Sequence, residues 1–205
     1  PFERPDVSVF ELDYVGVKAP QFSFTRLKGS DPVLGVEMAS TGEVACIGDD
    51  FEEAFLKSLL SIGFSIPDKN ILLSSGTFRN KTDFLEETRI LDGMGFRFYA
   101  TRGTAKFMQE NQIPVTELNW PLEKEEPNAL TYLEDGKIDL VINIPKDYRK
   151  EELTNDYNIR RTAVDFGVPL ITNLQLAQRL TESLTHVPIE KLTVQSWGSY
   201  GDDDE

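Results

Sequence analysis

The stretch YATRGTAKFM (residues 99–108) joins a strand-like sequence to a helix-like sequence through a very short turn. Residues 96–100 alternate between apolar and polar types, which is typical of a half-buried strand. The apolar residues within 105–108 favour a helix, which we expect over residues 104–111. A strand that passes directly into a helix is the repeating unit of parallel α/β sheets.

The same alternation of strands and helices extends along the chain from residue 71 onward. Further strands are predicted at residues 71–75, 114–118, 138–144 and 168–172. Further helices are predicted at residues 81–95, 128–136, 156–167 and 174–185. Strands that alternate with helices in this way predict an α/β fold, with a mainly parallel five-stranded sheet covered on both faces.

The first part of the chain predicts a different organisation, a small β-rich segment. Strand-like alternation occurs at residues 7–15, 22–27 and 33–40. A helix follows over residues 49–63, with Asp49 or Asp50 as its N-cap and Gly63 at its C-terminal end. We interpret residues 64–70 as a linker, and we expect an acidic, disordered tail at about 198–205.

Charge and composition narrow the classes of partner. The net charge is −14, from 21 basic and 35 acidic residues, which argues against binding nucleic acid through its phosphates. No apolar run approaches the length of a membrane span, so we expect no membrane partner. Cys46 is the only cysteine, which we expect to be a buried and inert thiol in a reducing, cytoplasmic setting. His186 is the only histidine, which argues against a metal site or a histidine-based catalytic triad.

Polar side chains follow each predicted strand, at the edge where open parallel sheets bind ligands. The candidates are Ser75, Thr77 and Lys81; Thr101 and Thr104; Trp120; Asn143 and Lys146; and Asn173. Gly103 permits close approach of the backbone, and a helix start at Thr104 supplies free N–H groups and a positive dipole end. Together these residues predict a site for a small anion, such as a phosphate or a carboxylate.

Several of these residues also have ordinary structural interpretations. Thr104 is an acceptable helix N-cap, Trp120 can anchor a core, and Asn143 can close a loop through its side chain. Arg160 and Arg161 either support the anion or pair with acidic groups across an interface.

Taken together, these motifs resemble the C-terminal end of the large subunit of carbamoyl-phosphate synthases. Residues 18–64 are similar to the close of the second ATP-grasp unit of that subunit. Four motifs resemble the regulatory domain that follows this unit: YATRGTA (99–105), NWP (119–121), DLVINIP (139–145) and YNIRRTAVDFGVPLITN (157–173). In the family, that domain has a Rossmann-like, methylglyoxal-synthase-like fold. The resemblance implies an ATP-grasp remnant at residues 1–66 and a regulatory domain at residues 67–205.

The resemblance also implies an allosteric effector site. Thr101 and Thr104 stand at the two threonines of a turn that contacts effectors in the family, and Asn143 stands at a contacting asparagine. Lys81 occupies the place of a lysine that binds effector phosphate in bacterial members, and Trp120 matches a tryptophan of members activated by N-acetyl-L-glutamate. The expected effector is therefore a small anion: UMP, IMP, another uridine nucleotide, ornithine or N-acetyl-L-glutamate.

Two positions depart from the pattern of members that respond to N-acetyl-L-glutamate. Lys146 and Asp156 stand where those members carry asparagines. An acidic group at position 156 would repel a carboxylate ligand unless it faces away from the site. Lys81 suits a phosphate-bearing nucleotide, on whose base Trp120 can stack.

For the parent enzyme, the resemblance implies synthesis of carbamoyl phosphate from bicarbonate, glutamine-derived ammonia and ATP, for pyrimidine or arginine biosynthesis. Its implied cofactors are ATP with Mg or Mn, and its implied partners are the rest of the large subunit and the glutaminase small subunit. We expect this stretch to bind no cofactor and to carry no catalytic residue or synthase activity by itself. The alternatives are a methylglyoxal synthase-type lyase, whose glycine-rich aspartate loop and histidines have no match here, and an interaction module without a ligand.

Overall fold

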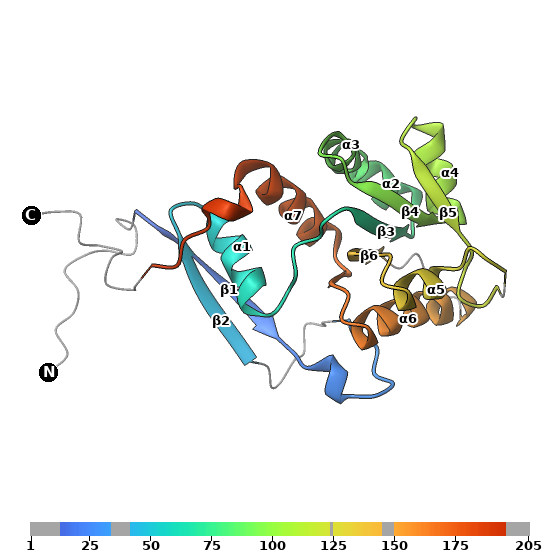
Figure 1. The fold of residues 1–205 in the computed structure, drawn as a ribbon, viewed down its shortest axis with the longest axis horizontal. Helices are drawn as coiled ribbons and strands as arrows, with labels where there is room; N and C mark the ends of the chain where they lie inside the picture. The colour runs from blue at the N-terminus through green and yellow to red at the C-terminus, as the bar shows by residue number, and fades with distance from the viewer. Residues whose placement is uncertain (1–12, 34–41, 124, 145–149, 196–205) are drawn as a thin grey trace, which may run out of the picture.

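The structure is a computed structural model that describes residues 13–33, 42–123, 125–144 and 150–195, without the side chains of residues 150–153. The first sheet has two antiparallel strands, β1 (Val15–Gln21) and β2 (Gly42–Gly48). A short 3₁₀ helix, η2 (Phe24–Arg26), follows β1, and helix α1 (Phe51–Ser61) follows β2. Figure 1 shows this sheet lying apart from the second, larger sheet, with α1 beside it.

The second sheet has five parallel strands in the order β5–β4–β3–β6–β7, which confirms the predicted architecture. Its strands are β3 (Asn70–Ser75), β4 (Arg97–Thr101), β5 (Val115–Leu118), β6 (Leu140–Ile144) and β7 (Leu170–Ile171). The helices of this part are α2 (Phe78–Asp83), α3 (Leu85–Gly93), α4 (Arg102–Glu110), α5 (Ala129–Glu134), α6 (Lys150–Asp165), α7 (Leu174–His186) and the 3₁₀ helix η3 (Ile189–Lys191). No helix in the described part of the chain has the length and apolar character of a membrane span.

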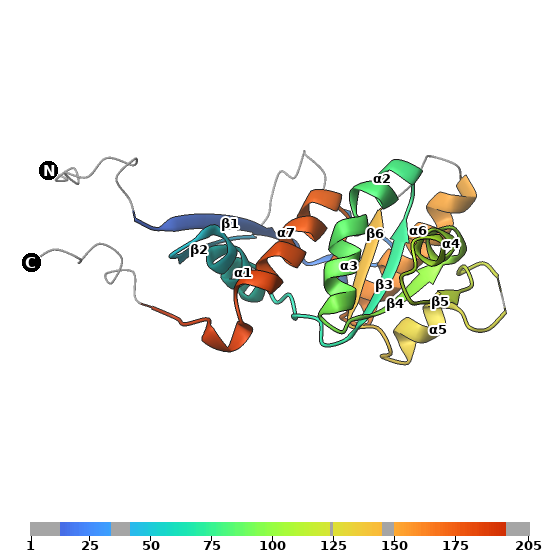
Figure 2. The same cartoon turned by 90° about the horizontal axis from the view of Figure 1, so that it is seen from above.

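The central strand β3 divides the hydrophobic core between the two faces of the sheet. Ile71 and Leu73 belong to a cluster with buried residues of α3, α4 and α7, whereas Leu72 belongs to a second cluster with residues of α5 and α6. Figures 1 and 2 show these two groups of helices on opposite sides of β3 and β6. Because side chains alternate along a strand, consecutive buried apolar residues such as Ile71, Leu72 and Leu73 of β3 are typical of a sheet buried on both faces.

Helix α1 joins the two sheets into one core. Asp50 caps it by accepting a hydrogen bond from the Glu53 N–H at 2.8 Å, and the chain leaves it through Gly63 at a φ of +84°. The buried apolar residues of α1 belong to the same cluster as one face of the large sheet: Phe55, Leu56 and Leu59. The helix predicted at residues 49–63 is therefore confirmed, and it packs beside α7 (Figure 2).

Several predicted elements differ from the structure. The strand predicted at residues 22–27 is wrong, because Phe24 and Leu27 form a 3₁₀ turn whose carbonyl groups accept hydrogen bonds from Arg161 instead of a neighbouring strand. Residues 7–12 of the strand predicted at 7–15 lie outside the described part, and of the described remainder only Val15 belongs to a strand, as the first residue of β1. Most of the strand predicted at 33–40 and the whole predicted tail at 198–205 also lie outside it.

Helix boundaries differ too. The helix predicted at residues 81–95 is two helices, α2 and α3, and the first begins at Phe78 after the cap residue Thr77. The break falls at Phe84, whose side chain is buried in the core. The helix predicted to begin at Thr104 begins at Arg102 instead.

The junction between β2 and α1 contains a partly buried ion pair. Lys57 Nζ lies 2.8 Å from Glu53 Oε1, and the two side chains are 13% and 15% exposed. Glu53 Oε2 also accepts a hydrogen bond from the Asp49 N–H at 2.8 Å. Burial by itself raises the pKa of Glu53, but the hydrogen bonds from Lys57 and Asp49 outweigh it, so that the pKa lies below its usual value.

Gly48 is required where β2 meets α1. A Cβ atom at this position would lie 2.5 Å from the backbone nitrogen of Ala54. We expect Gly48→Ala to lower the free energy of unfolding by about 1–3 kcal/mol, because either the helix or the strand must shift. Urea denaturation would measure the change. The control is Gly16→Ala in β1, where the added methyl group meets no atom within 4 Å; equal losses in the two variants would contradict this explanation.

The pair of Glu53 and Lys57 should make stability depend on pH. Because the pKa of Glu53 is lower in the folded chain than the ordinary value of 4.5, its contribution is complete above pH 4.5 and is lost as the pH falls through the folded value. We expect Glu53→Gln to cost about 1–2 kcal/mol at pH 7 and clearly less at pH 3, measured by urea denaturation. Glu86→Gln, at a side chain that is 75% exposed, is the control. A Glu53→Gln deficit that is the same at both pH values would disprove the assignment.

Candidate functional site

The carboxyl ends of β3, β4 and β6 border a cavity of about 250 Å³. The parallel register explains why these ends meet, since Leu73 lies opposite Ala100 of β4, and Ser74 lies opposite Asn143 of β6. Six of the predicted site residues line the cavity: Ser75, Lys81, Thr101, Gly103, Thr104 and Trp120. The predicted convergence of separate turns on one edge of the sheet is therefore present in the structure.

Buried hydroxyl groups form the base of this cavity. Thr104 Oγ1 accepts a hydrogen bond from the Ser75 N–H at 3.1 Å and lies 3.2 Å from the Ser75 carbonyl, to which it donates. The hydroxyls of Ser74 and Thr101 lie 3.2 Å apart. Thr104 therefore ties α4 to β3 and is not the N-cap, a position that Thr101 takes without a side-chain hydrogen bond.

The N-terminus of α4 and the Ser75 hydroxyl both offer hydrogen bonds to a ligand. The first N–H groups of a helix have no partner within the helix, and the Thr101 side chain does not cap them. Ser75 is only 6% exposed, and its Oγ makes no hydrogen bond within the described part of the chain. Buried polar atoms are normally paired, so an unpaired hydroxyl in a cavity wall is suited to a ligand atom.

Charged groups of both signs line the cavity. Lys81 extends from α2, and its Nζ donates to the Gly103 carbonyl at 3.0 Å. Arg102 is exposed and pairs with Glu117 at 3.4 Å and with Glu123 at 3.3 Å. Asp156 from α6 is buried and also lines the cavity, so it does not face away from the site.

Gly103 and Trp120 shape the space around these charges. A Cβ at Gly103 would lie 3.6 Å from Lys81 Nζ, an ordinary contact, so the absence of a side chain gives the ammonium group room and does not relieve strain. Trp120 is half-buried and packs against the core cluster of α5 and α6 while its other surface lines the cavity. Its interpretation as a core anchor and its interpretation as a site residue are therefore compatible.

Asn143 lies behind the cavity and not in its wall. It is completely buried, and its Nδ2 donates to Asp156 Oδ1 at 2.9 Å, while its Oδ1 accepts from Arg160 Nη1 at 2.8 Å. It therefore orients a cavity residue instead of closing a loop.

The remaining candidates within the described residues do not line the cavity. Thr77 and Asn173 are helix caps, which accept hydrogen bonds from the N–H groups of Asn80 and Leu176. Arg160 and Arg161 bind the N-terminal segment, which agrees with their interpretation as interface residues. Lys146 lies outside the described residues.

Five cavity residues were absent from the predicted set: Ser74, Gly76, Arg102, Ile144 and Asp156. Ser74 precedes Ser75 at the end of β3, and paired serines after an apolar run are a signal that the sequence contained. Asp156 was identified only as a departure from a family pattern, and its position in the cavity wall depends on the packing of α6 against β6.

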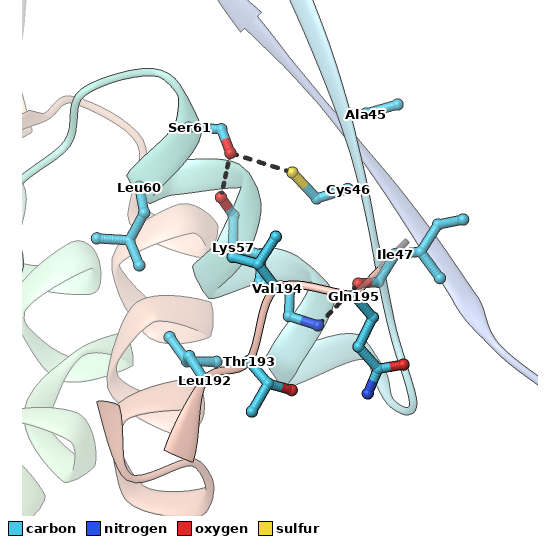
Figure 3. Close-up of a pocket in the computed structure, with 10 residues that line it drawn as sticks. All are labelled: Ala45, Cys46, Ile47, Lys57, Leu60, Ser61, Leu192, Thr193, Val194 and Gln195. Carbon is cyan, nitrogen blue, oxygen red and sulfur yellow. Dashed lines mark hydrogen bonds between the residues drawn. The ribbon is translucent and has the colours of Figure 1, made fainter. Parts of the chain in front are cut away.

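A larger cavity of about 440 Å³ lies away from the strand ends, between β2, α1 and residues 192–195. Figure 3 shows that its wall is largely aliphatic, with Ile47, Leu60 and Val194 around it. Cys46, which is partly exposed and not buried as expected, lies with its Sγ 3.3 Å from Ser61 Oγ. These groups do not form a converging set of charged side chains for a small anion, so the cavity at the strand ends is the candidate site. Within the described residues no cluster of histidine, cysteine or acidic side chains could hold a metal ion.

Comparison with known proteins identifies the kind of chain that carries this site. The model of the MGS-like domain family matches residues 83–172. The chain is 48% identical over 190 residues to multifunctional protein pyr1-3 of Dictyostelium discoideum, covering 88% of the chain and 8% of that protein. It is 42% identical over 203 residues to multifunctional protein CAD of Squalus acanthias, covering 91% and 9%.

A third relative is the mitochondrial carbamoyl-phosphate synthase [ammonia] of Homo sapiens, 43% identical over 184 residues, or 87% of the chain and 12% of that protein. The chain therefore spans only a small part of the length of these relatives. The matched residues contain four of the five strands of the parallel sheet, β4 to β7, whereas β3 precedes them. Residues 83–172 therefore match the MGS-like domain family, and most of the chain is similar to one region of these multifunctional proteins and of a carbamoyl-phosphate synthase.

Proposed function

We propose that this chain is the allosteric, effector-binding region of a carbamoyl-phosphate synthase large subunit, and that the cavity at the ends of β3, β4 and β6 is its effector site. The observation that carries the proposal is the convergence on one cavity of Lys81, the N-terminus of α4 and the Ser75 hydroxyl, which has no hydrogen-bond partner among the described residues. Helix N-termini and lysines together favour an anion. The similarity to the named synthase supports the identity of the parent enzyme.

The charges of the cavity favour a phosphate-bearing effector. Lys81 and α4 provide positive potential for a phosphate group, and Trp120 offers a flat apolar surface for a base. Asp156 in the wall accepts hydrogen bonds, which suits a sugar hydroxyl or an ammonium group and opposes a second carboxylate. A uridine nucleotide, UMP or IMP therefore fits better than N-acetyl-L-glutamate, and ornithine fits through its ammonium groups.

In the parent enzyme this region would act by population shift. An effector that binds one state of the enzyme more tightly than another shifts the equilibrium by that difference, which is typically about 1–3 kcal/mol. The parent would use ATP with Mg or Mn to make carbamoyl phosphate from bicarbonate and glutamine-derived ammonia. Residues 1–66 would be the end of its ATP-grasp unit, and the glutaminase small subunit would be a further partner. No catalytic residue is proposed within this chain.

The alternative of a methylglyoxal synthase-type lyase is disfavoured by the position of the only histidine. His186 ends α7, where its ring nitrogen lies 2.8 Å from the Glu182 carbonyl, and it does not line the cavity at the strand ends. Measured conversion of dihydroxyacetone phosphate to methylglyoxal by the chain would restore the lyase hypothesis.

Isothermal titration of the chain with a panel of compounds tests the effector site. The panel is UMP, UTP, IMP, ornithine, N-acetyl-L-glutamate and phosphoribosyl pyrophosphate. We expect saturable binding of at least one phosphate-bearing compound and no measurable binding of N-acetyl-L-glutamate, because Asp156 opposes its second carboxylate. Binding of none of the compounds would favour an interaction module over an effector domain.

Replacement of Lys81 tests the anion subsite directly. Lys81→Ala should weaken the bound phosphate compound by about 1.5–3 kcal/mol, since it removes a charged hydrogen-bond partner. Lys106→Ala on α4 is the matched control, because it removes the same charge from a side chain that is 76% exposed and pairs with Glu110. Equal affinities of Lys81→Ala and the unaltered chain would show that Lys81 is not a contact.

A further inference from the structure

A continuous chain of hydrogen bonds leads from the cavity to the N-terminal segment. It begins at Asp156 in the cavity wall, which accepts from Asn143 at 2.9 Å. Asn143 in turn accepts from Arg160 Nη1 at 2.8 Å. Arg160 also donates two hydrogen bonds to the Asp31 carboxylate, from Nε to Oδ1 at 2.8 Å and from Nη2 to Oδ2 at 2.6 Å. Four side chains therefore connect the cavity to a segment more than 120 positions earlier in the sequence.

Burial makes the Arg160 position depend on both of its partners. The Arg160 side chain is 2% exposed, and Asn143 is fully buried, whereas the Asp31 side chain is 44% exposed. A buried guanidinium group is costly unless its charge and its N–H groups are paired. Loss of the hydrogen bonds to Asp31 or to Asn143 would therefore leave N–H groups of the buried Arg160 unpaired. For this reason we expect a change at one end of the hydrogen-bond series to affect the other end.

Helix α6 carries, on neighbouring turns, the residue that lines the cavity and the residues that bind the N-terminal segment. Asp156 and Arg160 lie four positions apart, so they share one side of the helix. The Tyr157 hydroxyl donates to the Gly29 carbonyl at 3.0 Å, and Arg161 Nη1 donates to the carbonyl groups of Phe24 and Leu27. The same helix thus supplies a wall of the cavity and holds residues 24–31.

We propose that the path Asp156–Asn143–Arg160–Asp31 couples occupancy of the cavity to the position of residues 24–31. A hydrogen-bond donor of the ligand would compete with Asn143 for the Asp156 carboxylate. The resulting shift of Asn143 would change the hydrogen bonds between Arg160 and Asp31. This inference rests on the proposed effector site, but the path itself can be tested without a ligand. Coupling is reciprocal, so loosening Asp31 must also change the affinity of the cavity.

Amide hydrogen exchange of the ligand-free chain tests the path. Asp156→Asn replaces the charged acceptor of Asn143 with a weaker, neutral one, and we expect it to accelerate exchange of the amides of residues 24–31 by roughly threefold to tenfold, as for residues coupled in one hydrogen-bond network. The same substitution in an Asp31→Asn background should add nothing, because the path is already broken. Asp135→Asn, which removes an acidic charge paired with Lys137, is the control and should leave these amides unchanged.

Two results of this experiment would overturn the proposal: no acceleration in Asp156→Asn, or the same acceleration with and without Asp31. Both substitutions keep the side-chain shape, and Asp31 is partly exposed, so both variants should fold. Unfolding by urea would verify this.

A titration with UMP separates the coupling from the effector site. If UMP binds, Asp31→Asn should change its dissociation constant by roughly threefold or more, although Asp31 does not line the cavity. Asp135→Asn, which removes an acidic charge paired with Lys137, is again the control and should leave the dissociation constant of UMP unchanged. Equal UMP affinities of Asp31→Asn and the unaltered chain would overturn the coupling. If UMP does not bind, the evidence against the effector site grows, while the exchange experiment still decides whether the path exists.

Discussion

The parallel pairing of β3 with β4 and β6 is the constraint on which the site depends. It places the ends of three strands at one edge of the sheet, although their residues are far apart in the sequence. An antiparallel neighbour would direct its turn to the opposite edge, and Thr101 or Asn143 would leave the cavity region. The buried, apolar character of β3 enforces this arrangement, because a strand covered by helices on both faces is stable only in the interior of the sheet.

Most of the fold was accessible from the sequence because its signals are local. Alternation of apolar residues indicated the five strands, and Asp50 and Gly63 marked the ends of α1 by their side-chain and backbone preferences. The stretch at residues 22–27 could not be predicted in this way. Its alternation is that of a strand, but Arg161, more than 130 positions later, takes its carbonyl hydrogen bonds.

The residues of the candidate site also fall into two groups: those placed by local features of the sequence, and those placed by contacts between distant elements. Ser75, Thr101 and Thr104 lie at or next to strand ends, so the topology brings them together, whereas Lys81 reaches the cavity from α2. The roles of Asn143 and Asp156 depend on how α6 packs against β6, which no local pattern encodes. The sequence therefore indicates which residues meet, whereas the structure is needed to decide which of them face the cavity and which orient the others.

The net charge of the molecule explains why the cavity needs nearby positive groups. A chain with a net charge of −14 repels small anions at long range, so an anion binds only where nearby positive groups overcome this repulsion. Lys81 and the N-terminus of α4 supply that positive potential within the cavity. Asp156 partly cancels it, yet its carboxylate is held by Asn143, which Arg160 orients in turn. In the proposed coupling, the acid that limits the choice of ligand is also the residue through which a ligand acts on residues 24–31.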